Sequence, residues 1–165
     1  MPGLVTQRLI RYHILDCVRG ETPPWPASAL RDVELKFRVT DATADTVKMR
    51  VSGHAFLDQE GEWCVHPPSS SEFRTGEMCC FIRERGFDAV LLGYLSFDRR
   101  AQTFSRFDLV AVGTRWGETT FNVRRKDVAP APMGIAITLA GRVARDRTGP
   151  HISQTRKSWQ RYFAL

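Results

Sequence analysis

Hydrophobic and polar residues alternate along much of this chain, and the alternation predicts β-strands. In VELKFRV, residues 33–39, apolar and charged side chains follow one another without exception. The segment TVKMRVS, residues 46–52, has the same alternation, and the polar TDATAD between the two favours a hairpin. Because neighbouring side chains on a strand point to opposite faces, both segments predict strands with one buried and one solvated face.

The N-terminal segment follows a helical period instead. Over residues 4–18 the apolar positions approximate one stripe, and Gly20 provides a stop. The prolines of TPPWP, residues 22–26, predict an extended connector whose Trp25 packs on the body. We therefore divide the chain into an N-terminal helix and connector (1–26), an antiparallel β domain (27–141) and a basic C-terminal tail (142–165).

Further strands are predicted from EMCCFIRER onward, at 87–97, 103–113, 119–123 and 133–141. If DRRAQ joins 87–97 to 103–113 in a hairpin, Phe97 lies opposite Thr103. In that register Phe107 covers Gly93, and Tyr94 faces Arg106. One face of the hairpin is then apolar throughout, whereas the other mixes aliphatic side chains with Asp88, Tyr94, Arg106 and Asp108.

A hairpin with two largely apolar faces belongs either in the middle of a packed structure or in the wall of a cavity. Because the strands are sequential and antiparallel, the predicted class is mainly β. We expect an antiparallel meander forming a small barrel or curled sheet, with an N-terminal helix and a short C-terminal helix. A β-sandwich is the alternative.

Asp108 is the most unusual polar residue of the predicted hairpin. Aspartate is disfavoured within strands, and Arg106 lies two residues away on the same face. A mainly apolar wall with a few polar groups is typical of small-molecule sites, so we predict a small, partly apolar ligand in a barrel-like cavity. The predicted ligand-binding residues are Val90, Leu92, Tyr94, Arg106, Asp108 and Val110. An enzyme centred on Asp108, with His54 as a second titrating group, is ranked below this non-enzymatic interpretation.

The net charge of +6 is concentrated in the tail. This asymmetry supports an alternative function, in which the tail binds nucleic acid or an anionic surface through phosphate contacts and stacking. The residues that would do so are Arg142, Arg145, Arg147, Arg156, Lys157, Trp159 and Arg161. Nucleic acid is not favoured as a partner, because the body of the protein is nearly neutral.

The four cysteines are predicted to be free thiols. Charges interrupt the N-terminal segment, so it does not resemble a secretion signal, and we predict a cytoplasmic protein. Cys64 and His66 have no second ligand pair at a zinc-site spacing, and we predict neither a metal nor a cofactor. No apolar run approaches the roughly 20 residues of a membrane span. The sequence leaves the oligomeric state open.

Overall fold

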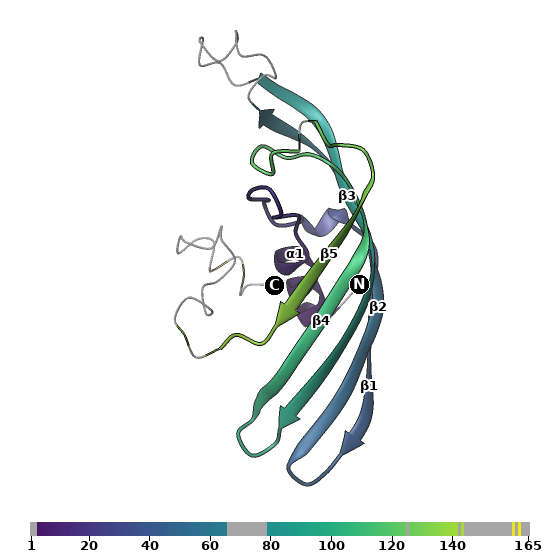
Figure 1. The fold of residues 1–165 in the computed structure, drawn as a ribbon, viewed down its shortest axis with the longest axis vertical. Helices are drawn as coiled ribbons and strands as arrows, with labels where there is room; N and C mark the ends of the chain where they lie inside the picture. The colour runs from purple at the N-terminus through teal and green to yellow at the C-terminus, as the bar shows by residue number, and fades with distance from the viewer. Residues whose placement is uncertain are drawn as a thin grey trace.

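The computed structural model describes residues 3–65, 79–124, 126–141, 143, 160 and 162. Its elements are helix α1 (Leu4–His13), a short 3-10 turn η1 (Ala27–Ala29), and strands β1 (Leu30–Ala42), β2 (Thr46–Val65), β3 (Cys79–Asp98), β4 (Thr103–Gly117) and β5 (Ala131–Thr138). The strands form one long curved sheet with α1 on its concave side (Figure 1). No helix among the described residues is long and apolar enough to cross a membrane.

The sheet is an antiparallel meander with the strand order β1-β2-β3-β4-β5. This confirms the mainly β class and the curled sheet with an N-terminal helix. Strands β1 and β5 are its two edges, so the sheet is open. Within the described part of the chain the strands form this single sheet, and neither a closed barrel nor a two-sheet sandwich is present.

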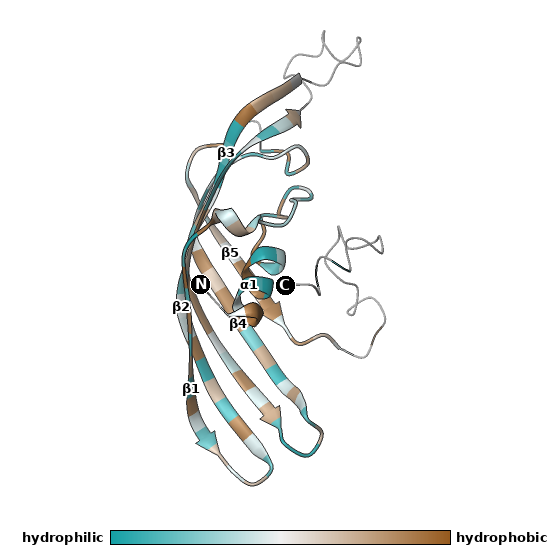
Figure 2. Cartoon of the chain, turned by 180° about the vertical axis from the view of Figure 1, so that it is seen from behind, coloured by the Kyte–Doolittle hydropathy of each residue, from teal (hydrophilic) through white to brown (hydrophobic). Residues whose placement is uncertain are grey.

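The hydrophobic core lies on the concave side of the sheet, which we call the covered face. There Ile10, Ile14 and Trp25 from the N-terminal segment belong to one buried cluster with side chains of the sheet. The strand members of that cluster are Val51, Ala55, Leu57, Phe87, Ala89, Leu91, Leu95, Leu109, Ala111 and Met133. All occupy odd-numbered positions, as the alternation predicts, and apolar and polar bands alternate along the strands in Figure 2. The opposite side, with the even-numbered positions of β2–β5, we call the open face.

Helix α1 ends at His13, earlier than the predicted stop at Gly20. The connector ends the helix by binding its last carbonyl groups. The backbone N–H of Trp25 donates to the carbonyl of Arg11 (3.0 Å), and its indole N–H donates to the carbonyl of Ile14 (2.7 Å). Trp25 is only 3% exposed, which confirms that it packs on the body. The apolar stripe continues past the helix because Ile14 and Leu15 are still buried there.

The predicted strand at 119–123 is wrong. The chain leaves β4 at Gly117, whose φ of +80° is a left-handed conformation that ends the strand. The following segment forms an irregular loop in which the backbone N–H of Thr119 donates to Oδ1 of Asn122 (2.9 Å). The last strand begins at Ala131 and ends at Thr138, slightly earlier than predicted.

The predicted hairpin exists, but its register differs from the expected one. Asp98, rather than Phe97, lies opposite Thr103, and a bulge between Ser96 and Phe97 adds a further residue. Tyr94 therefore lies opposite Asp108 instead of Arg106, and Gly93 faces Leu109 instead of Phe107. From Ser96 and Arg106 away from the turn the pairing is displaced by two residues, so those side chains stay on their predicted face. On the turn side of the bulge the displacement is one residue, and Phe104 lies opposite Phe97 on the covered face instead of opposite Ser96.

The expectation of free thiols is wrong for two of the four cysteines. Cys64 on β2 lies directly opposite Cys80 on β3, and the two form a disulfide. Cys17 is free and exposed. The prediction was based on the expected compartment, whereas the pairing follows from the strand register, which the sequence spacing does not reveal.

Candidate functional site

The six predicted ligand-binding residues lie together on the open face of β3 and β4. Val90 and Val110 are 69% and 45% exposed, and Leu92 and Tyr94 are similarly exposed. They therefore form a surface, whereas an enclosed barrel-like cavity was expected. The sheet does not close around them, because β1 and β5 are free edges among the described strands.

The position of Asp108 in the middle of a strand is explained by its neighbours. Its Oδ2 accepts a hydrogen bond from Nε of Arg106 at 2.5 Å, and the Arg106 guanidinium lies 5.8 Å from the Tyr94 ring centre. Both members of the ion pair are about half exposed, so it adds at most about 1 kcal/mol. His54 lies opposite Val90, with Nε2 2.9 Å from Asp32, so it does not reach Asp108.

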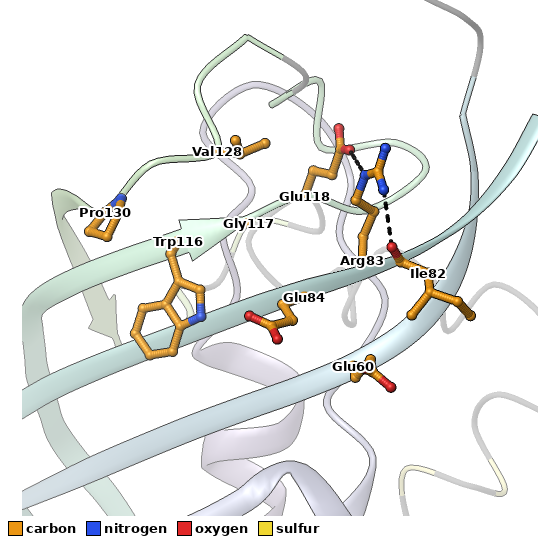
Figure 3. A pocket seen from close by; sticks show the side chains of 9 residues that line it. All are labelled: Glu60, Ile82, Arg83, Glu84, Trp116, Gly117, Glu118, Val128 and Pro130. Carbon is orange, nitrogen blue, oxygen red and sulfur yellow. Dashed lines mark hydrogen bonds and ion pairs between the residues drawn. The ribbon is translucent and has the colours of Figure 1, made fainter.

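A second feature was not predicted from the sequence. A pocket of about 580 Å³, which we call the acidic pocket, lies where β4 passes into the loop that leads to β5 (Figure 3). It combines carboxylates with an indole ring and aliphatic groups. Its lining residues are Glu60, Ile82, Arg83, Glu84, Trp116, Gly117, Glu118, Val128 and Pro130.

Two of its carboxylates are placed by the sheet itself. Glu60 on β2 and Glu84 on β3 lie directly opposite each other, and both side chains are exposed on the open face. Like charges in this arrangement destabilise the strand pair. A cation bound between them would remove this repulsion.

Trp116 forms an aromatic wall of the pocket. It lies opposite Gly86 on β3, and its ring packs on that glycine so closely that a Cβ at position 86 would be 1.9 Å from Cζ2. Phe56 is next to the indole, with 6.1 Å between ring centres. In Figure 3 the Trp116 ring lies beside the carboxylate of Glu84. The pocket thus offers a fixed π-system next to negative charge.

Glu118 supplies the third carboxylate and is only 5% exposed. Its Oε1 accepts a hydrogen bond from Nε of Arg83 at 3.1 Å, and its backbone N–H donates to the carbonyl of Glu84. Its Oε2 is buried without a hydrogen-bond partner. A buried acceptor without a donor costs about 1–3 kcal/mol, and more when it is charged. With three carboxylates and one guanidinium, the pocket is negatively charged.

Ion pairs of two buried arginines fix the loop that forms the far wall. Arg124 donates to both carboxylate oxygens of Asp16, at 2.8 and 2.9 Å, and Nη2 of Arg115 lies 2.6 Å from Asp127. Hydrogen bonds from Arg115 and Arg124 lower the pKa of Asp127 to about 2. The backbone of Gly117 also donates to the carbonyl of Val128 (2.8 Å). These contacts hold Val128 against the end of β4.

Arg85 is buried on the covered face and has a structural role. Its guanidinium lies 4.1 Å from the Trp25 ring centre and donates to the carbonyls of Pro23 and Pro24 and to Gln59. Burial lowers its pKa to about 9. Arg85 therefore holds the proline-rich connector against the covered face of the sheet.

The seven predicted binding residues of the basic tail lie outside the described residues, so this alternative stays a prediction. Tyr162, from the same tail, is described and helical. Its hydroxyl is 3.0 Å from Nε2 of His13, and its ring meets that of Tyr12 edge-on at 5.0 Å. This part of the tail therefore contacts α1.

Comparison with known proteins gives no further guide: no family model, no curated protein and no solved structure matches the chain.

Proposed function

We propose that the protein is a non-enzymatic domain that binds a small, partly apolar organic cation in the acidic pocket. The observation that carries the proposal is the opposed pair Glu60 and Glu84 beside the ring of Trp116. Carboxylates next to an exposed aromatic face form the usual environment for an ammonium or guanidinium group, and a desolvated cation–π contact contributes about 2 kcal/mol. The predicted ligand class is kept, but its site moves from the Asp108 surface to this pocket.

The shape of the pocket supports an organic cation rather than a metal ion. Its carboxylates are spread along the wall, and among the described residues no three His, Cys, Asp or Glu side chains are grouped to hold a metal. Ile82, Val128 and Pro130 provide apolar contacts for a hydrocarbon part of the ligand. The unpaired Oε2 of Glu118 adds negative charge at the back of the site.

Calorimetry with two nearly isosteric probes tests the proposal. The 2-phenylethylammonium ion should bind at pH 7 and low salt, and the uncharged 2-phenylethanol should bind at least tenfold more weakly. Glu84→Gln should weaken binding of the cation by about fivefold, the equivalent of about 1 kcal/mol. Glu34→Gln, on β1 of the same face, is the matched control and should bind normally. Equal binding of both probes, or no binding of the cation, would refute the proposal.

A cytoplasmic location also stays a proposal. The Cys64–Cys80 disulfide counts against it, because lasting disulfides are typical of oxidising compartments. Mass spectrometry of the protein from its own source, trapped with an alkylating agent at lysis, would show whether this bond exists in the cell.

A further inference from the structure

We propose that the open face of the sheet is the interface of a symmetric dimer of this chain. The centre of the face is an exposed aliphatic strip. Val90 lies opposite Val112, and Leu92 lies opposite Val110, all between 41% and 69% exposed. On β5, Ala136 lies opposite Val110 and extends the strip. On β2, Phe56 lies diagonal to Val90, beyond His54. A contiguous apolar surface of this kind marks a protein interaction site.

Opposite charges at the two ends of the strip indicate that the partner is a second copy of this chain. On one side along the strand direction the open face is acidic, with Asp32, Glu34, Asp58, Glu60, Glu84 and Asp88. On the other side it is basic, with Lys36, Arg38, Lys48, Arg50 and Arg106. Arg31 pairs with Asp58 at the acidic end, and Glu34 pairs with Lys36 between the two ends. Asp41 and Asp108 pair with Lys48 and Arg106 at the basic end, so each end keeps an excess of its own charge. A second copy offers the complementary pattern.

Two two-fold axes can bring the open faces of two copies together, and the charge pattern selects one of them. If the axis is perpendicular to the strands and in the plane of the interface, the acidic end of each chain meets the basic end of its partner. An axis parallel to the strands would bring acidic ends together. The first arrangement is isologous, so the same patch serves both copies. It packs two sheets face to face at about 10 Å, as in a β-sandwich.

The face is large enough for a stable dimer. Four strands about 4.8 Å apart, each contributing about ten residues of about 3.3 Å, cover about 600 Å² per chain. The open face is the convex side of the sheet, so the two chains together would bury at most about 1,200 Å², against the roughly 1,000 Å² expected of a biological interface. The centre of the strip, at Val90, is six residues from Glu84, or about 20 Å along β3. Glu60 and Glu84 belong both to the acidic end and to the acidic pocket. The dimer is therefore tested without ligand, so that the failure of one proposal is distinguishable from the failure of the other.

Sedimentation of the full-length chain tests the proposal first. At tens of micromolar it should have twice the mass of the 18.8 kDa chain. Val90→Asp should make it monomeric. Val18→Asp is the matched control, because Val18 is equally exposed (67%) but lies between α1 and the connector, and this variant should stay dimeric. A monomeric wild type, or a folded Val90→Asp variant that is still dimeric, would overturn the proposal.

A charge exchange tests the arrangement with exposed substitutions that leave the strip intact. A chain with Lys48→Glu and Arg50→Glu has two acidic ends. A chain with Asp32→Lys, Asp58→Lys and Asp88→Lys has two basic ends, because the three lysines and Arg31 then outnumber Glu34, Glu60 and Glu84. Each should be monomeric alone, and a 1:1 mixture should form a heterodimer that weakens as salt is raised. Circular dichroism confirms folding of each variant. Self-association of either variant at wild-type strength, or a mixture that stays monomeric, would overturn the arrangement.

Discussion

The indole ring of Trp116 lies directly on Gly86 of the neighbouring strand, with its ring atoms in the space where a side chain at position 86 would begin. Glycine is thus required at position 86 by the ring and not by the backbone, since its φ is not positive. The contact fixes the aromatic wall of the acidic pocket and joins β3 to β4. It links the stability of the sheet to the geometry of the proposed site.

Gly86→Ala should therefore affect both properties. The new methyl group would be within 2.0 Å of two ring carbons, so Trp116 must move, at a cost of about 1–3 kcal/mol in the free energy of unfolding. Gly134→Ala, on β5, is the control, because its nearest atom is 4.0 Å away. Denaturant unfolding and the binding of 2-phenylethylammonium measure the two effects. Equal stability and equal binding of the two variants would contradict this reading of the contact.

Arg124→Gln should strongly destabilise the fold. It removes the charge that pairs with Asp16 in a largely buried environment, and breaking a buried pair costs about 3–5 kcal/mol. Arg106→Gln makes the same chemical change in the exposed pair with Asp108 and should cost less than about 1 kcal/mol. Urea unfolding of both variants measures the difference. Similar losses for the two would show that the Arg124 pair is not buried in solution.

The burial of His13 beside Tyr162 should make stability depend on pH. Burial lowers the pKa of His13 below its ordinary value of 6.5. The unfolded chain therefore binds a proton more readily, so stability is complete above about pH 6.5 and falls as the pH drops below it. His13→Gln should remove this part of the slope between pH 7.5 and 5. An NMR titration of His13 with a midpoint at or above 6.5 would contradict the assignment.

The Cys64–Cys80 disulfide should stabilise the far end of the β2–β3 hairpin. It closes a segment with a sequence separation of 16, and a loop of this size is worth about 3 kcal/mol in the chain-entropy description. Reduction should lower the urea midpoint of the wild type. It should leave a Cys64→Ser, Cys80→Ser double variant unchanged. A wild type that does not respond to reductant, and whose mass does not change by two hydrogens, would show that the bond is absent.

Strict alternation was sufficient to predict which side chains lie on each face of the sheet. VELKFRV and the segments 87–97 and 103–113 alternate as expected, and the error in register changed the face only beside the turn, at Phe104. The register itself depends on the turn at Asp98 and on the bulge beside Phe97, which no local pattern reveals. TTFNV has the composition of a strand, but the left-handed Gly117 directs it into a loop.

The acidic pocket could not be predicted from the sequence either, because it depends on the register of strands that are far apart in the sequence. Glu60 and Glu84 are 24 positions apart, and only the long pairing of β2 with β3 brings them opposite each other. Glu118 is buried by a loop held by Arg115 and Arg124, and Asp16, one partner of Arg124, lies 108 positions away in the sequence. By contrast, the Asp108 cluster was found because it is local, with Arg106 two residues away.

The most direct test of the proposed function is the position of a bound cation relative to Trp116. The chain has four tryptophans, so a nitrogen–proton correlation spectrum contains four indole signals, and Trp116→Phe identifies one of them. Addition of 2-phenylethylammonium should shift the Trp116 signal in a saturable manner, and 2-phenylethanol should need at least tenfold higher concentrations for the same shift. If no indole signal moves, or if another tryptophan responds while Trp116 does not, the cation does not bind in the acidic pocket.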